Sequence, residues 1–227
     1  MLRKFFFGCG IAALALLYWF PIRRWLNQWG ATPEELTRVM TGDYLVVHPT
    51  HSATQAVTVA APPGDIWPWL VQMGYQRGGL YSYDGLARSF GFLDGQSADQ
   101  VLPQFQHLAV GDQILLGPGE ELTVTAAEPL RALVLSYTGH GIEWVWQFGL
   151  YPFDATHTRL VSRCTARTPS TIGARLGMLV VEPAAFLMTR GVLLGLRQRA
   201  ETLRRSLSSP RALGPAPLPV LVAPRAE

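Results

Sequence analysis

The stretch from Thr54 to Gly91 constrains the fold of this chain more than any other part of its sequence. Residues 54–60 alternate as a strand does, with the β-branched Val57 and Val59 on one face. The Ala-Pro-Pro-Gly that follows must end the strand, because proline donates no hydrogen bond to a neighbouring strand. A strand, a sharp turn and then helices are therefore expected here.

Two short helices are expected after this turn. Asp65 is placed as an N-cap, and Pro68 would then be the third helical residue, where a missing N–H costs nothing. Gly74 is expected to close this helix. The second helix is expected to run from an N-cap at Ser82 to a stop at Gly91.

Five more strands are expected at residues 113–116, 121–127, 132–137, 143–151 and 158–166. Turn residues separate them at short intervals, so consecutive strands should pair as one antiparallel sheet. In the strand 143–151, two tryptophans and a phenylalanine share one face, and a glutamine lies on the other. The aromatic face is expected to look toward the core and the glutamine face toward water.

A long helix is expected over residues 169–207. An apolar stripe recurs at helical spacing: Ile172, Leu176, Leu179, Val180, Pro183, Phe186 and Leu187. Pro183 should kink this helix or divide it in two. The fold class predicted is α+β, an antiparallel sheet of about six strands wrapped around a long C-terminal helix.

Several runs of the sequence resemble one known superfamily: WGATPEE, TGDYLV, WPWLVQMG, GGLYSYD and LAVGDQILLGPG, with EPAAFLMTRGVLLGLRQRAE near the C-terminus. They are similar to a bacterial branch of the START-like superfamily, also called SRPBCC or Bet v 1-like, which includes polyketide cyclases and lipid-transport proteins. The resemblance covers roughly residues 29–207. It implies a helix-grip fold with an apolar cavity between sheet and helix, and it implies no particular reaction.

The N-terminus is expected to hold a membrane anchor. Phe5–Phe20 is an uncharged run that becomes eighteen residues long with Pro21 and Ile22, which as a helix spans about 27 Å. The alternative is a buried helix of a soluble protein. The side of the membrane stays open, because Arg3 and Lys4 at one end balance the two arginines at residues 23 and 24.

Four regions are expected along the chain. Residues 1–28 are the N-terminal transmembrane anchor. Residues 29–53 are a capped helix and linker, and the N-cap of that helix is Thr32. Residues 54–207 are the helix-grip domain, and 208–227 are a Pro/Ala-rich tail expected to be disordered.

Composition and motifs exclude several classes of function. The net charge is +3 with a pI near 9.1, and no basic stripe interleaves with aromatic residues, so nucleic acid is not expected as a partner. Cys9 and Cys164 are not expected to pair. The five histidines lack the spacing of metal ligands, and no phosphate-binding or dinucleotide-binding motif is present, so neither a metal nor a cofactor is expected.

The residues expected to line the cavity or its mouth are Trp69, Arg77, Tyr81, Tyr83, Trp144, Trp146, Phe148 and Phe186. For the aromatic residues, packing in the core is the alternative. For the cluster around Tyr83, a simple helix cap is the alternative to a polar lip at which Arg77 would face a carboxylate or phosphate of the ligand. Arg163 needs a partner such as Glu143 if it points inward, and is ordinary surface if it points outward.

Three functions are compatible with these features. The preferred one is a membrane-anchored protein that binds a hydrophobic small molecule or lipid in the cavity. The second is a cyclase, dehydratase or hydrolase that uses Tyr83, Asp84 or His140 as acid or base. The third is a structural or regulatory protein with a vestigial cavity, for which a filled core would be expected.

Overall fold

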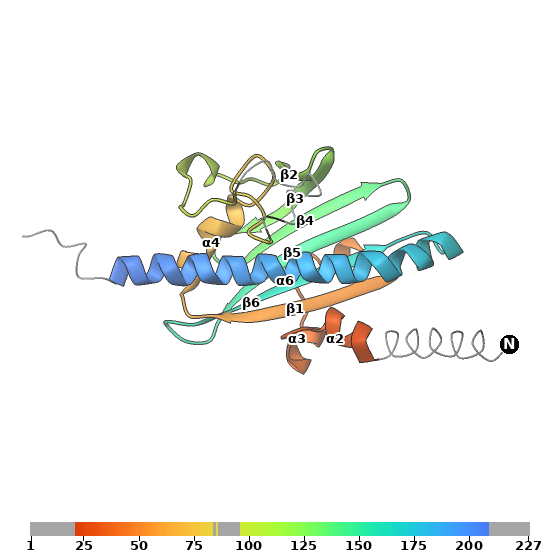
Figure 1. Cartoon of the computed structure of the whole chain (residues 1–227), viewed down its shortest axis with the longest axis horizontal. Helices are drawn as coiled ribbons and strands as arrows, with labels where there is room; N and C mark the ends of the chain where they lie inside the picture. Colours follow the sequence, from red (N-terminus) through yellow and green to blue (C-terminus); the bar gives the residue numbers. More distant parts are fainter. Residues whose placement is uncertain (1–20, 84, 86–95, 209–227) are drawn as a thin grey trace, which may run out of the picture.

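The computed structural model describes residues 21–83, 85 and 96–208 (Figure 1). The N-terminal elements are α2 (Arg23–Asn27), α3 (Pro33–Thr37) and the 3-10 helix η2 (Asp43–Leu45). The strands are β1 (His51–Val59), β2 (Gln113–Gly117), β3 (Glu120–Glu128), β4 (Ala132–Gly139), β5 (Ile142–Pro152) and β6 (Thr158–Arg167). The remaining helices are α4 (Pro63–Val71), η3 (Pro103–Phe105) and α6 (Ile172–Ser208).

The strands form one antiparallel sheet in the order β1-β6-β5-β4-β3-β2. Strands β2 to β6 form a meander, and β1 closes the arrangement by pairing with β6 along its whole length. The long helix α6 lies across one face of the sheet (Figure 1). The expected fold class, a six-stranded antiparallel sheet with a long C-terminal helix, is therefore confirmed, and its architecture is that of a helix-grip fold.

The core lies between this inner face of the sheet and the helices α4 and α6. Val57 and Val59 point into it, as the alternation in β1 predicted. Trp146 and Phe148 from β5 are buried in the same cluster as Leu193 and other α6 residues. The aromatic face of β5 thus faces the long helix, as expected.

The outer face of the sheet is covered as well, which corrects the expectation that the Gln147 face is wet. Gln147 is only 1% exposed. Its Oε1 accepts a hydrogen bond from the backbone N–H of Gly42 at 2.8 Å, and its Nε2 donates to Asp43 Oδ1 at 2.7 Å. The chain that leads into β1 therefore packs over the back of the sheet and buries a glutamine that looked solvent-facing in the sequence.

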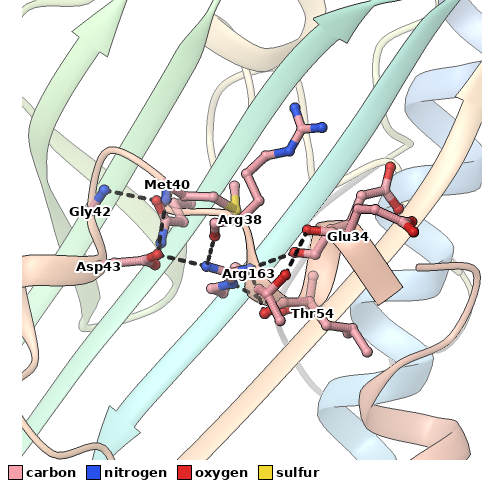
Figure 2. A network of polar contacts seen from close by, with 11 residues as sticks. Glu34, Arg38, Met40, Gly42, Asp43, Thr54 and Arg163 are labelled. Atoms are coloured by element: carbon pink, nitrogen blue, oxygen red, sulfur yellow. Dashed lines mark hydrogen bonds and ion pairs between the residues drawn. The ribbon is translucent and has the colours of Figure 1, made fainter. Parts of the chain in front are cut away.

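Arg163 holds this N-terminal segment in place (Figure 2). It points outward, but the segment covers it, so neither of the two expected situations applies. Its guanidinium donates to Asp43 Oδ2 at 2.6 Å, to the carbonyl oxygens of Glu35 at 2.7 Å and Arg38 at 2.8 Å, and to Thr54 Oγ1 at 3.0 Å. The expected partner Glu143 pairs with Arg167 instead.

Helix α4 begins earlier than the sequence suggested. Its N-cap is Pro62, its first residue is Pro63, and Asp65 lies in the first turn instead of capping it. A proline at the first helical position fixes φ favourably, so the Pro-Pro pair starts the helix by itself. Pro68 is consequently an interior residue, and the helix ends at Val71, before Gly74. The second expected helix, 82–91, lies largely outside the described residues.

The face of α6 that packs on the sheet is not the apolar stripe predicted from the sequence. Its buried residues are Glu182, Phe186, Thr189, Val192, Leu193, Leu196 and Ala200. Of the predicted stripe, Phe186 is buried, whereas the exposed fractions of Leu179 and Ile172 are 38% and 78%. The helix continues unbroken through Pro183. Because α6 is one continuous helix, the contacts of its second half also determine which face its first half turns toward the sheet.

The N-terminal boundary of the packed domain also differs from the expected one. Helix α2 lies within residues 1–28, yet it packs against α6 and β1. The expected anchor helix Phe5–Phe20 and the tail beyond residue 208 lie outside the described residues. In the part of the chain that is described, α6 is the one helix long and apolar enough to span a membrane, and its second half is packed on the sheet.

Candidate functional site

A narrow hollow lies between the inner face of the sheet and the first half of α6. Its volume is about 20 Å³. Strand β1 contributes His51 and Gln55, β6 contributes Ser162 and Cys164, and α6 contributes the side chains of Glu182 and Phe186. The hollow therefore combines an apolar lining with a cluster of buried polar groups, which is the usual composition of a small-molecule site.

A buried carboxylate is the centre of this polar cluster. Glu182 is 3% exposed, and its carboxylate contacts Arg23 on α2 at 2.7 Å and His51 Nδ1 at 3.1 Å. Burial raises the pKa of Glu182, but its interactions with His51 and Arg23 outweigh burial and hold it at about 2. Glu182 is therefore a stable anion at neutral pH, ready to orient a neighbouring donor.

Gln55 supplies an acceptor that the protein itself does not use. The residue is 3% exposed, and its Nε2 donates to the carbonyl oxygen of Leu26 at 3.1 Å. Its Oε1 is buried without a hydrogen-bond partner among the described residues. Buried polar atoms are normally paired, so an unpaired oxygen in a residue that lines a hollow indicates a place for a donor from outside the chain.

The aromatic strand forms the wall beside this polar cluster. Trp144 is half-buried and stacks on Trp146 with ring centroids 6.4 Å apart. Their indole N–H groups donate to Cys164 Sγ at 2.7 Å and to Ser162 Oγ at 2.9 Å. Burial raises the pKa of the Cys164 thiol to about 11, so it is protonated and is not a nucleophile at neutral pH.

The predicted ligand residues divide into separate groups. Trp144, Trp146 and Phe148 lie on the inner face of the sheet, whereas Phe186 lines the hollow from α6 and packs against Trp25 and Trp29. Trp146 and Phe148 are fully packed, with centroids 4.9 Å apart. These two rings are therefore packed core, the alternative given above for the aromatic residues. Phe186 lines the hollow, and Trp144 lies next to it through its contact with Cys164.

A second group surrounds α4. Trp69 and Tyr81 are buried against each other, edge to face, with centroids 6.1 Å apart. Burial raises the pKa of Tyr81. Arg77 stacks over Phe105 at 4.6 Å and donates to the carbonyl oxygen of Val71 at 2.9 Å. These contacts tie the loop after α4 to its neighbours, and they do not direct Arg77 toward the hollow.

The three acid–base candidates do not meet at one point. Tyr83 is 41% exposed and accepts a hydrogen bond from Arg190 at 2.9 Å. His140 is exposed in the β4–β5 turn, beside Gly141, which borders Pro169 just before α6 begins. The distance along α6 from Ile172 to the Tyr83 contact is about 27 Å. Asp84 lies outside the described residues.

A larger hollow lies on the other side of the sheet. It has a volume of about 540 Å³, is open to solvent, and its residues include His48, Thr138, Glu143 and Arg167. Glu143 and Arg167 form an ion pair across β5 and β6. Because Glu143 and Arg167 neutralise each other, this pair leaves no net charge with which the hollow could select a ligand. Among the described residues, no cluster of three or more His, Cys, Asp or Glu could hold a metal ion.

The residues missed by sequence reasoning are the polar ones of the narrow hollow. His51, one of the five histidines that lack the spacing of metal ligands, begins β1 and is 9% exposed. One signal did exist, since Glu182 is the only carboxylate in the apolar run from Ile172 to Met188. A charge in such a run either faces water or needs a buried partner. Nothing in the sequence marks Gln55.

Comparisons with known proteins identify likenesses of structure only. No protein-family model matches the sequence, and no curated protein matches it. The Zhui aromatase/cyclase from Streptomyces sp. R1128 resembles the chain at 16% identity, covering 70% of this chain and 98% of that one, with a TM-score of 0.42. A Polyketide_cyc-like protein from Corynebacterium glutamicum has 16% identity, coverage of 69% and 93%, and a TM-score of 0.37.

A START superfamily protein from Mycobacterium smegmatis has 14% identity, coverage of 67% and 99%, and a TM-score of 0.38. Proteins of the START and polyketide-cyclase type are thus among the solved structures similar to this chain. The class of architecture is defined here by the strand order and by the position of α6.

Proposed function

We propose that this protein binds a hydrophobic small molecule or lipid between the sheet and the first half of α6. The unpaired Oε1 of Gln55 carries the proposal, because an oxygen acceptor requires a ligand that donates a hydrogen bond. The ligand class is therefore an apolar molecule with a hydroxyl group. Its hydroxyl would meet Gln55, and its apolar part would run along Trp144 and Phe186.

Ligand entry on this proposal requires α6 to move. A hollow of about 20 Å³ has room for one water molecule, whereas ligand sites are usually some hundreds of Å³ in volume. The first turns of α6 are suited to such movement, because Ile172, Leu176 and Val180 are exposed instead of packed on the sheet. On this proposal the arrangement of α6 on the sheet is a closed form of the site.

The membrane attachment belongs to the same proposal. The apolar run Phe5–Phe20 would anchor the chain in a bilayer, where hydroxyl-bearing apolar molecules are dissolved. Helix α2 directly follows this run and is joined to α6 by the Arg23–Glu182 contact. An anchored protein would thus keep its site close to the source of its ligand.

A matched pair of ligands tests the proposed site. A fluorescent long-chain alcohol and its methyl ether differ in one donor, and only the alcohol can donate to Gln55. We expect the alcohol to bind about three- to tenfold more tightly than the ether, the effect of about one hydrogen bond. Gln55→Met should abolish this difference, and Gln198→Met, the same exchange at an exposed position in the second half of α6, should retain it. Failure of both ligands to bind, or discrimination that persists in Gln55→Met, would contradict the proposal.

An enzymatic function is the second candidate, and the His51–Glu182 contact favours it. A carboxylate 3.1 Å from an imidazole nitrogen can fix the orientation of that ring for proton transfer. His51→Gln separates the two functions, since a binding protein should keep its affinity for the alcohol. If the protein converts such molecules to products, His51→Gln should abolish that conversion and leave binding intact.

A further inference from the structure

The first three turns of α6 expose apolar side chains on more than one side. The exposed fractions are 78% for Ile172, 60% for Leu176 and 73% for Val180. Val181, with 53% exposed, points opposite to Ile172, since nine residues at about 100° each amount to two and a half turns. Apolar side chains therefore lie on opposite sides of this part of the helix, which also contains one charged residue, Arg175.

The neighbouring helix α2 continues the same surface. Trp25 is 57% exposed, and its ring lies 5.4 Å from that of Phe186 on α6. Ile22, immediately before α2, is 40% exposed. Exposed apolar patches that extend over several elements are uncommon on soluble monomers and indicate a contact with a partner or a membrane.

The position where the N-terminal run ends identifies the partner. The apolar run Phe5–Phe20 stops just before α2, and Arg23 of α2 is fixed to Glu182 of α6 at 2.7 Å. Whatever surrounds the run is thereby held beside the exposed turns of α6. A second helix could cover only one side of those turns, whereas a lipid layer can surround them.

We propose that the start of α6, residues 172–181, inserts together with Ile22 and Trp25 into the interfacial layer of a lipid bilayer. This inference rests on the membrane attachment proposed above. Tryptophan is a residue favoured at that depth, and an apolar helix end is suited to the boundary between headgroups and acyl chains. Glu182 and Phe186, which border the hollow, follow within two helical turns, so the site would open at the bilayer surface.

Spin labels on the full-length chain test this contact. Cys9→Ser removes the N-terminal thiol, and the partly buried Cys164 reacts poorly because its thiol is protonated. Labels are placed singly at Leu176→Cys, Val180→Cys and, as a control at an exposed position in the second half of α6, Gln198→Cys. The protein is reconstituted into vesicles of phosphatidylcholine and phosphatidylglycerol. Collisions of each label are measured with oxygen, which concentrates in lipid, and with a water-soluble nickel chelate.

We expect oxygen collisions to exceed nickel collisions several-fold at positions 176 and 180, with the reverse at 198. Nickel access at 176 and 180 equal to that at 198 would overturn the inference. So would exclusion of both reagents, which would mean that protein covers these turns. A further label at Ala13→Cys tests the anchor separately. If nickel reaches the label at position 13, the membrane attachment is refuted. If the label at position 13 lies in lipid while nickel reaches the label at position 180, the α6 contact alone is refuted.

Discussion

Arg23 and Glu182 meet through two parallel hydrogen bonds, from Nε to Oε2 and from Nη2 to Oε1, both 2.7 Å long. The two residues are 159 positions apart in the sequence. The Glu182 side chain is 2% exposed and also contacts His51. This paired contact connects the end of the apolar N-terminal run to the helix that covers the candidate site, so the proposed membrane attachment and the proposed ligand binding would share one structural element.

The stability conferred by Glu182 should depend on pH in a defined window. Its folded-state pKa of about 2 is below the ordinary 4.5, so the carboxylate stabilises the fold above pH 4.5 and loses this effect as pH falls toward 2. Urea unfolding of the wild type and Glu182→Gln should give a difference in unfolding free energy that shrinks across this window. A difference that stays constant from neutral pH to pH 2 would show that the Glu182 charge does not contribute.

Arg163 should contribute far more stability than its neighbour Arg167. Arg163 is 6% exposed and bonds Asp43 together with backbone carbonyl oxygens, and breaking a buried pair costs about 3–5 kcal/mol. The Arg167 pair with Glu143 is partly solvated, and such pairs contribute about 1 kcal/mol or less. Urea unfolding of Arg163→Ala and Arg167→Ala measures both. Equal losses would mean that the segment before β1 is not held by Arg163.

The two tryptophans of β5 should respond differently to truncation. Trp146 is 1% exposed and packs on Phe148, so Trp146→Ala should lower the unfolding free energy by about 3–5 kcal/mol. Trp144 is half-buried beside the hollow, so Trp144→Ala should cost less stability and weaken alcohol binding more. Both variants are measured by urea unfolding and by the binding titration. A Trp144→Ala variant as unstable as Trp146→Ala, with unchanged binding, would place both rings in the core alone.

Two truncations should distinguish the anchor from the packed domain. Removing residues 1–20 is expected to move the protein from the membrane fraction to the soluble fraction and to leave its melting temperature unchanged. Removing residues 1–28 also deletes α2 and leaves Glu182 without Arg23, so this variant should melt at a lower temperature. Full-length protein found already in the soluble fraction would refute the anchor.

The strands could be predicted because alternation and turn residues are local signals. The face of α6 that packs on the sheet could not be predicted, because two sets of apolar residues on this helix both have helical spacing. One set includes Ile172 and Leu176, and the other includes Phe186 and Leu193. Which of them packs depends on the sheet. The burial of Gln147 was equally hidden, since its partner Gly42 is 105 positions away. The candidate site shows the same limit: Glu182 stands out in an apolar run, but its partners are brought to it only by the fold.

Native mass spectrometry of the full-length protein, extracted from membranes in a mild detergent, tests the central claim most directly. The account predicts that the wild type and Gln198→Met carry an added mass, and that extraction releases an apolar molecule with a hydroxyl group. Gln55→Met should carry much less of it. Wild-type protein that is folded yet carries no added mass, even after incubation with membrane lipids, would contradict the account and favour a protein whose cavity is vestigial.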